Sequence, residues 1–403
     1  MPSEHTREGH LHTIFISRHA PWPPNGGVQL RNWQNLSCVA RLGSVDLLVV
    51  HAEEGDRAPD LVAESLLLPP GPRLRGLERR AFWHRRAALP SSLRLVQDRG
   101  LRWLEERLKA HPGALVVLEE VFLGGYLETA LGHGGRVVFD AHNVEADLRQ
   151  KTGTGGTGFL GQLRAKALAK RMSELEGDLV RRSHHVWACS ETDRRLFGEL
   201  YGDTAPIAVV PNTVAFDAYA DVRATRPKAQ GNNIAMTGTF GYPPNVEAAH
   251  FLIEELLPRM ARERPETELF LIGRDPQPFM LDAAKANERI HVTGPVPSVK
   301  PFLEQADVLV APLFTGSGTR LKIVEAFTAG RPVVSTAKGA EGIEANDGEH
   351  VFLREDADGM AQAIFRLWDE PELRESMIDA ALELARERYS WDTVEAAIRA
   401  SLA

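Results

Sequence analysis

The sequence predicts an α/β protein made of two doubly wound domains, and three observations lead to this fold class. Short apolar, β-branched segments recur along the chain and alternate with longer segments of helical periodicity. Such apolar runs are typical of parallel strands covered by helices on both faces. The alternation occurs twice within 403 residues, a length that exceeds what one core usually serves. Because ligands of these sheets bind at the carboxyl ends of the strands, we expect two domains facing one interdomain cleft.

The first domain is expected to span residues 1–213. Its strand candidates are six apolar segments, at residues 12–17, 45–50, 114–119, 136–141, 184–189 and 207–212. Helical periodicity predicts helices between them, for example over residues 28–43 and 162–182. A polar, proline-bearing stretch from Pro211 to about residue 231 is typical of a domain boundary.

The second domain is expected to span residues 214–385. Its strand candidates are five apolar segments, at residues 233–238, 268–273, 289–294, 307–312 and 331–336. Helices are predicted over residues 245–262, 298–305 and 320–329, and the tail from residue 371 onward has helical periodicity. This strand–helix alternation again indicates a parallel sheet.

A glycine-rich turn follows the strand at residues 307–312 and is the most informative feature of the chain. It consists of Gly316, Ser317, Gly318 and Thr319. A helix is predicted to begin directly after it. Small residues let a ligand approach the backbone N–H groups closely, and the first N–H groups of a helix, together with its dipole, favour an anion. The turn therefore predicts a phosphate site.

Charged residues complete this predicted site. Arg320 and Lys322 lie in the first helical turn, where cations oppose the helix dipole unless an anion accompanies them. Glu325 lies on nearly the same face as Lys322, and its carboxylate suits the hydroxyl groups of a ribose. Phosphates beside a diol describe a nucleotide or a nucleotide sugar. The alternative is an ordinary strand–helix–strand unit in which Ser317 or Thr319 caps the helix and the charges are solvated.

Two features of the first domain also follow predicted strands. Gly26 and Gly27 precede a helix, so their backbone amides suit a pyrophosphate; the alternative is a plain proline–glycine turn. His142 comes directly after the strand RVVFDA, at the end of the strand where α/β enzymes collect side chains. Asp140 and Glu145 flank this histidine, and either could orient its ring.

These blocks resemble the group 1 glycosyltransferases of the GT-B fold. The donor-binding motif of that family is similar to GSGTRLKIVEAFTAGRPVVST, and the resemblance continues through VTGPVPSVKPFLEQADVLVAPL, KGAEGI and ERYSW. Upstream it includes DAHNVE, CSETD, VVPNTV and MTGTFGYPPN, in the order of the family. The resemblance covers most of the chain. It implies two Rossmann-like domains and a last helix, residues 386–403, that crosses back to the N-terminal domain.

The resemblance also implies an activity. Members of the family transfer a hexose, with retention at the anomeric carbon, from a UDP- or GDP-linked sugar to a hydroxyl group of a saccharide, a glycolipid or a small molecule. His142, Arg320 and Lys322 are the expected catalytic residues, the two cations stabilising the departing diphosphate. The expected donor-binding residues are Gly26, Gly27, Thr239, Gly316, Ser317, Gly318, Thr319, Arg320, Lys322 and Glu325.

The sequence departs from the family pattern at two places. Many members have a glutamate that touches the donor sugar where this chain has Ser317. Many also place Arg and Lys after the first strand of the second domain, where this chain has GTFGYPPN at residues 238–245. Arg320 and Lys322 are expected to take over the diphosphate, and Thr239 to donate one hydrogen bond. Two alternatives stay open: a nucleotide-sugar epimerase of the same architecture, and a non-catalytic sugar-nucleotide-binding protein.

No cofactor and no metal ion are expected. The sequence has no HExxH motif, no Cys/His spacing for zinc and no Asp-x-Asp pair at a strand end. The two cysteines, Cys38 and Cys189, form no CxxC pair, so a reducing cytoplasm is the expected location. The N-terminus lacks a signal-peptide pattern, and no apolar run approaches the ~20 residues that span a bilayer.

The distribution of charge argues against a nucleic-acid partner, because the net charge is −8 and neither domain is strongly basic. One segment is basic: residues 73–109 hold eleven Lys or Arg and four Asp or Glu, interleaved with Phe82, Trp83 and Trp103. Such a segment suits weak peripheral contact with the anionic inner surface of a membrane, or an anionic acceptor. The alternative is a solvated pair of helices that covers the core.

Overall fold

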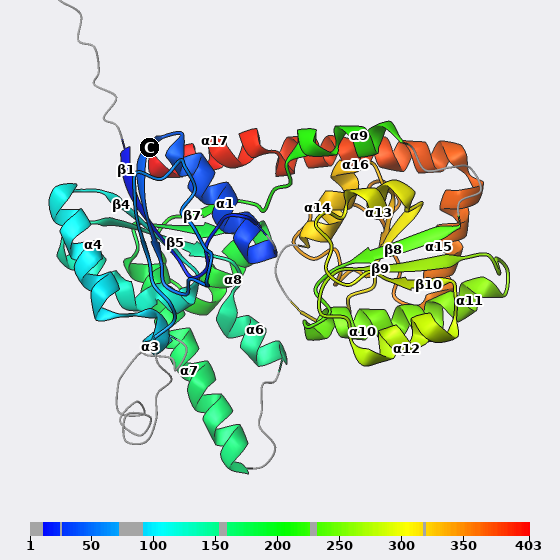
Figure 1. The fold of residues 1–403 in the computed structure, drawn as a ribbon, viewed down its shortest axis with the longest axis horizontal. Coiled ribbons are helices and arrows are strands. Elements are labelled where there is room, and N and C mark those ends of the chain that lie inside the picture. Colours follow the sequence, from blue (N-terminus) through cyan, green and yellow to red (C-terminus); the bar gives the residue numbers. More distant parts are fainter. Residues whose placement is uncertain (1–10, 25, 72–91, 153–158, 226–231, 317–319) are drawn as a thin grey trace, which may run out of the picture. The chain divides into compact units, whose positions relative to one another are not determined.

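The computed structural model describes residues 11–24, 26–71, 92–152, 159–225, 232–316 and 320–403. The chain divides into two compact units. The first unit contains Met1–Val210 and Val394–Ala403, and the second contains Pro211–Thr393. Each unit is a parallel sheet with helices (Figure 1). In the part of the chain that is described, no helix is both long and apolar enough to cross a bilayer.

The sheet of the first unit has seven parallel strands in the order β3-β2-β1-β4-β5-β6-β7. The strands are β1 (Leu11–Ser17), β2 (Gly43–Val49), β3 (Glu64–Leu67), β4 (Leu115–Glu119), β5 (Arg136–Ala141), β6 (His185–Ala188) and β7 (Ile207–Val209). Strands β2 and β3 follow on one side of β1, and strands β4 to β7 follow on its other side. The topological switch point therefore lies between β1 and β4, where ligands of doubly wound sheets bind.

The helices of the first unit surround this sheet. They are α1 (Gly27–Ala40), α3 (Ser92–Leu95), α4 (Asp98–Ala110), η2 (Val121–Tyr126), α5 (Leu127–Gly132), α6 (Glu145–Thr152), α7 (Phe159–Arg182) and α8 (Glu191–Tyr201). The last helix, α17 (Trp391–Leu402), packs on the same unit. Trp187 Nε1 of β6 donates to Ser401 Oγ at 2.9 Å, and Arg41 pairs with Glu395.

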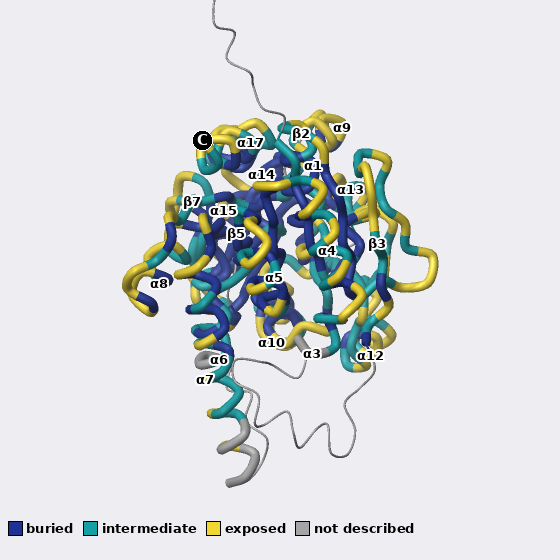
Figure 2. The backbone as a smooth tube through the Cα atoms, turned by 90° about the vertical axis from the view of Figure 1, so that its left-hand side faces the viewer, coloured by how far each residue is buried: buried dark blue, intermediate teal, exposed yellow. Residues whose placement is uncertain are grey.

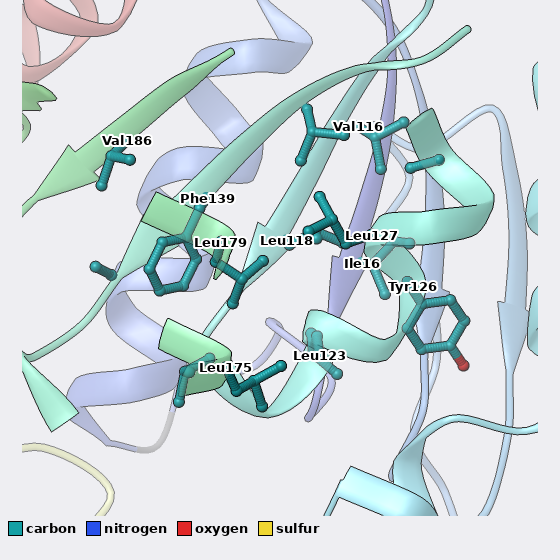
Figure 3. Close-up of a cluster of buried hydrophobic side chains, with 14 of the residues drawn as sticks. Ile16, Val116, Leu118, Leu123, Tyr126, Leu127, Phe139, Leu175, Leu179 and Val186 are labelled. Carbon is teal, nitrogen blue, oxygen red and sulfur yellow. The ribbon is translucent and has the colours of Figure 1, made fainter. Parts of the chain in front are cut away.

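The core of the first unit explains why these segments form strands and helices. Figure 3 shows Ile16, Val116, Leu118 and Phe139 from neighbouring strands meeting Leu175 and Leu179 of α7, together with Leu123, Tyr126, Leu127 and Val186. Both α7 residues are buried, although most of that helix has a weak polar–apolar asymmetry. Burial of each large apolar side chain contributes about 1.5–3 kcal/mol, so this contact fixes α7 on the sheet.

The sheet of the second unit has six parallel strands in the order β10-β9-β8-β11-β12-β13. They are β8 (Asn233–Thr237), β9 (Glu268–Ile272), β10 (Ile290–Val292), β11 (Val308–Ala311), β12 (Val333–Ser335) and β13 (Phe352–Leu353). The helices are η3 (Phe216–Tyr219), α9 (Ala220–Ala224), α10 (Pro243–Phe251), η4 (Leu252–Leu256), α11 (Leu257–Ala261), α12 (Pro278–Ala286), α13 (Lys300–Gln305), α14 (Leu321–Thr328), α15 (Ala357–Asp369) and α16 (Pro371–Tyr389). The switch point of this sheet lies between β8 and β11.

The predicted strands are confirmed, and two strands were missed. Every apolar segment that the sequence marks contains a strand. The missed strands, β3 and β13, are short edge strands of four and two residues, too brief for a recognisable pattern. The helix predicted over residues 245–262 is interrupted by the π-helical segment η4. Figure 2 shows the central strands as buried and helices such as α8 as largely exposed.

Candidate active site

The glycine-rich turn follows β11, at the switch point of the second unit. Gly316 has a φ of 94°, which favours glycine, and a Cβ there would lie 3.0 Å from Tyr242 Oη and from Pro244 Cγ. Gly316 therefore lies against Tyr242, at the end of the loop that follows β8, and against the start of α10 (Pro243–Phe251). Ser317, Gly318 and Thr319 lie outside the described residues. The helix α14 begins at Leu321 with Arg320 at its N-cap position.

The two predicted cations lie together at this helix end. Arg320 is 7% exposed, and its Nη2 donates to Thr315 O at 3.4 Å. Burial lowers the pKa of Arg320. Lys322 Nζ donates to Asn245 Oδ1 at 2.8 Å, and burial together with the neighbouring Arg320 lowers its pKa to about 7. A bound anion would reverse these shifts, because an opposite charge favours the protonated form.

The loop after β8 contributes the predicted Thr239 and connects it to these cations. Thr239 O accepts a hydrogen bond from Asn245 Nδ2 at 2.9 Å, and Asn245 in turn contacts Lys322. Arg274 Nε donates to Thr239 Oγ1 at 3.3 Å. Arg274, the first charged residue after β9, was missed in the sequence, although its place at a strand end was the available signal. The second unit thus brings a third cation next to the predicted site.

Close backbone approach holds these strand ends together. Gly273, at the end of β9, has a φ of 146°, and a Cβ there would lie 1.7 Å from Gly238 O. Only glycine fits such an approach. The loops that carry Thr239 and Arg274 are therefore held side by side.

Glu325 lies on α14 but is already engaged. The hydroxyl of Tyr219, in η3, donates to Glu325 Oε1. Burial raises the pKa of Glu325, against the opposing effects of that hydrogen bond and of Lys322. A ribose that used this carboxylate would share it with Tyr219, a partner that sequence periodicity does not reveal.

A cavity of about 440 Å³ also lies on the second unit, next to the glycine-rich turn. Its lining is acidic: Glu247, His250, Phe251, Glu254, Glu255, Phe314, Glu355 and Asp356. Thr315 Oγ1 donates to Glu247 Oε2 at 2.8 Å. Carboxylates repel a phosphate, so the anion site is better placed at Arg320 and Lys322 than in this cavity.

In the first unit, Gly26 and Gly27 stand at the start of α1. Gly26 is the extended N-cap residue and α1 begins at Gly27, so the predicted loop-to-helix arrangement is present. Arg31 and Asn32 are among the polar side chains that this helix buries. Both contribute to the network that surrounds His142.

His142 lies at the end of β5, in contact with two carboxylates. Its Nε2 lies 2.8 Å from Glu119 Oε2 and 3.2 Å from Asp140 Oδ2. Arg31 donates to both oxygens of Asp140, with Nε at 2.8 Å from Oδ2. The amide of Asn32 satisfies its neighbours when it is oriented with its nitrogen toward Glu119, and it then donates to Glu119 Oε2 at 2.9 Å. The histidine is therefore held by one nitrogen within a buried network of alternating charge.

The charges of this network follow from its contacts. Burial opposes ionisation of Asp140, but Arg31 and His142 outweigh it and hold the pKa of that carboxyl well below its usual range. Burial and the neighbouring Asp140 raise the pKa of Glu119 to about 8. Burial disfavours the imidazolium of His142, yet hydrogen bonds to Asp140 and Glu119 raise its pKa to about 10. His142 is thus protonated at neutral pH.

The sequence identified one of the two partners of His142. Asp140 contacts the ring, but Glu145 is hydrogen-bonded to Asn143 at 3.5 Å instead, so it does not orient the ring. The missed partner is Glu119. Its signal was the acidic pair at the end of the strand ALVVLE: β4 and β5 are neighbours, and Glu119 is directly opposite Asp140 in their register.

Glu120 marks the switch point of the first unit. It has a φ of 75° and a ψ of 147°, a strained backbone conformation for a residue with a side chain. Its Oε2 is buried and has no hydrogen-bond partner. Strain of this kind persists only where the surrounding structure holds it, and it concentrates at functional sites.

Among the described residues, two groups bring three candidate metal ligands within 4.8 Å: Glu119, Asp140 and His142, and His12, Asp46 and His111. In each group an arginine already donates to the buried aspartate, Arg31 in the first and Arg107 in the second. A metal ion in either group would lie close to a guanidinium group, which would repel it. The rings of His12 and His111 also stack at 3.5 Å with 9° between their planes, so their lone pairs do not converge on one ion. Metal independence stays a prediction.

The basic segment at residues 73–109 is described in part. Phe82 and Trp83 lie outside the described residues, whereas Trp103, on α4, packs against the hydrophobic core of the first unit. Arg107 pairs with Asp46 and Glu64. Trp103 therefore packs on the core, and Arg107 forms ion pairs with strands β2 and β3 at the edge of the sheet.

Comparison with known proteins identifies the family. The family profile of the "Glycosyl transferase 4-like domain" matches residues 26–213, and that of "Glycosyl transferases group 1" matches residues 231–370. The chain belongs to the group 1 glycosyltransferases. The family resemblance seen in the sequence is confirmed.

Curated relatives match about half of the chain. It is 28% identical over 218 residues to the phosphatidyl-myo-inositol mannosyltransferase of Mycolicibacterium smegmatis, covering 52% of this chain and 55% of the relative. It is 27% identical over 242 residues to the glycogen synthase of Mycobacterium tuberculosis, covering 57% of this chain and 56% of the relative. The chain thus spans about half the length of the curated relatives it matches.

Solved structures share the fold of the chain. Anabaena HepE in complex with UDP has a TM-score of 0.67 at 14% identity, covering 97% of this chain and 99% of that one. Sucrose-phosphate synthase from Thermosynechococcus elongatus has a TM-score of 0.69 at 16% identity, covering 97% and 98%. The two doubly wound sheets therefore have the GT-B fold, as the sequence predicted.

Proposed function

We propose that this glycosyltransferase transfers a hexose from a UDP- or GDP-linked sugar to a hydroxyl acceptor, with retention at the anomeric carbon. The observation that carries the proposal is the pair of neighbouring cations, buried Arg320 and partly buried Lys322, that follows the glycine-rich turn of the second unit. Their lowered pKa values mean that each would be stabilised by an anion. The relatives' names support sugar transfer, and HepE binds UDP and UDP-glucose.

In this proposal the second unit stabilises the leaving group. Charge accumulates on the diphosphate as the bond to the sugar breaks, and fixed donors aimed at that charge lower the barrier. Arg320, Lys322 and the backbone N–H groups at the start of α14 supply these donors, with Arg274 and Thr239 beside them. Glu325 receives a ribose hydroxyl on the oxygen that Tyr219 leaves open.

His142 acts as a hydrogen-bond donor to the transferred sugar. Its Nε2 is occupied by Glu119 and Asp140, and its raised pKa keeps the ring protonated at neutral pH. No described residue is hydrogen-bonded to its Nδ1, so the Nδ1–H group is available to a sugar hydroxyl. A protonated histidine does not serve as a general base, which fits a reaction in which the ring positions the sugar.

The test is incubation of the full chain with a panel of UDP- and GDP-hexoses, followed by analysis of both products. Release of the nucleoside diphosphate, with an α-linked sugar from an α-linked donor, is the expected result. An epimerised donor without release would favour the nucleotide-sugar epimerase. Calorimetric binding of the donor without any turnover would favour the non-catalytic sugar-nucleotide-binding protein.

A further inference from the structure

A cluster of basic side chains lies at the carboxyl ends of β1 and β2, beside the switch point of the first unit. Arg18 and His19 follow β1, His51 follows β2, and Arg94 comes from α3. The donor site and the His142 network use none of these residues. Their position is where the ligand of this sheet would bind.

Arg18 is held in place without a polar partner for its inner nitrogen. Its Nε is buried and has no hydrogen-bond partner, and its guanidinium carbon lies 5.6 Å from the centre of the Phe122 ring. Phe122 belongs to η2, directly after β4, so the contact spans the switch point. A buried N–H group without an acceptor destabilises the fold, which points to an acceptor that a ligand supplies.

Two imidazole rings stand next to Arg18. The rings of His19 and His51 have centroids 4.8 Å apart, and Nδ1 of His51 is buried without a hydrogen-bond partner. Burial, Arg18 and the neighbouring His51 lower the pKa of His19 to about 4. Burial, Arg18 and Arg94 likewise lower the pKa of His51. The arginines therefore create a positive potential at this place. Together with burial, this potential favours the neutral form of the His19 and His51 rings.

The nearby carboxylates do not neutralise the cluster. Asp56 and Glu53 raise the pKa of His19 and of His51 respectively, but less than the other causes lower it. Asp56 instead accepts from the backbone N–H of Glu53, at 2.8 Å. Neither Arg18 nor Arg94 forms an ion pair with any carboxylate of the described chain. A metal ion is a poor occupant, because the two guanidinium groups would repel it.

We propose that Arg18, His51 and Arg94 bind an anionic group, a phosphate or a carboxylate, that the acceptor of the glycosyl transfer carries. An anion would accept from the buried Nε–H of Arg18 and from His51. Arg94, whose Nε donates to Gly71 O at 2.9 Å, would add a second positive charge near His51. The identification of the ligand as the acceptor rests on the proposed function. The anion site itself rests on the cluster alone.

The site is tested by histidine NMR of the full chain with inorganic phosphate as the probe, against chloride at equal ionic strength. The variants His19→Gln and His51→Gln assign the two ring signals. Phosphate should shift both signals and raise both apparent pKa values, because a nearby negative charge favours the imidazolium. Arg18→Gln should weaken the phosphate effect about tenfold, the consequence of losing one charge-assisted hydrogen bond. Arg99→Gln, an exposed arginine of α4, is the matched control and should leave it unchanged.

Ring signals that do not respond to phosphate, or that respond equally in the Arg18→Gln variant, would overturn the proposal. The source of the anion is then distinguished by two probes: glucose 6-phosphate against glucose, and vesicles containing phosphatidylglycerol against phosphatidylcholine vesicles. A soluble phosphorylated acceptor predicts a response to the first pair, and a phospholipid headgroup predicts a response to the second. The donor site is tested separately, by comparing UDP and GDP binding of the wild type with that of the Lys322→Ala variant. A failure of the proposed donor function would leave nucleotide affinity unchanged in that variant, whatever the response of His51 to phosphate.

Discussion

The Arg31–Asp140–His142 network of the first unit and the Arg320–Lys322 pair of the second both bury charge at the ends of strands, but they balance it differently. In the first unit, each buried cation faces a buried carboxylate within hydrogen-bond distance. In the second, the two cations repel each other, and burial lowers the pKa of both. A network whose cations are hydrogen-bonded to buried carboxyl groups holds its shape without a ligand, whereas two neighbouring cations gain stability when an anion binds.

The largest expected effect is on stability in the first unit. Arg31→Met leaves Asp140 buried without its guanidinium, so the free energy of unfolding should fall by about 3–5 kcal/mol. Urea denaturation followed by tryptophan fluorescence measures this change. Arg41→Met is the matched control, because its pair with Glu395 is partly exposed and contributes at most about 1 kcal/mol. Equal losses of stability in the two variants would mean that the buried Arg31–Asp140 pair stabilises the fold no more than an exposed ion pair does.

The same substitution in the second unit should behave in the opposite way. Lys322→Met removes a cation that burial disfavours, so stability without ligand should be unchanged or higher at pH 6. The pKa of Lys322 is lowered to about 7, so the folded protein binds fewer protons than the unfolded chain above that pH. The wild type therefore gains stability as pH rises from 7 toward the ordinary lysine range, and the advantage of the variant shrinks. A large loss of stability in Lys322→Met would make this residue structural.

Nucleotide affinity should depend on the cations of the second unit, although their removal costs little stability. Lys322→Ala or Arg320→Ala should weaken UDP or GDP binding about tenfold or more, since a charge-assisted hydrogen bond contributes about 1.5–3 kcal/mol. Calorimetry measures this, with Lys285→Ala on the exposed face of α12 as control.

Nucleotide affinity of the wild type should fall as pH rises through 7, because the ligand favours protonated Lys322. Lys322→Arg should flatten that pH dependence, since arginine stays charged.

His142→Ala is expected to change turnover and not nucleotide affinity. One hydrogen bond to the sugar corresponds to a loss of about tenfold in kcat. Glu119→Gln should have a smaller effect that depends on pH: it removes a carboxylate that raises the pKa of His142, so activity should decline at a lower pH than in the wild type. A pH profile of kcat for the two enzymes checks this. An unshifted profile would show that Glu119 does not act through His142.

The two regions also differ in how far the sequence predicts them. The glycine-rich turn, Arg320, Lys322 and Glu325 are close in sequence, so local periodicity places them on one helix end. Glu119 and His142 meet because β4 and β5 are neighbours in the sheet, and Tyr219 reaches Glu325 from a segment about a hundred residues earlier. Such contacts depend on strand order and on packing, which a single sequence does not reveal. The strands themselves were predictable because burial on both faces requires apolar runs, whereas the short edge strands β3 and β13 carry no such run.

The smallest expected effect concerns metal removal. The proposed donor site supplies positive charge through Arg320, Lys322 and helix N–H groups, so a divalent ion has no required role on the diphosphate. Turnover should be unchanged within error after dialysis against EDTA, measured with and without added Mg²⁺ and Mn²⁺. Activity lost in EDTA that returns on addition of a divalent metal would contradict the prediction of a metal-independent enzyme. The group of Glu119, Asp140 and His142, in which Arg31 donates to Asp140, would then be a first candidate for the metal ligands.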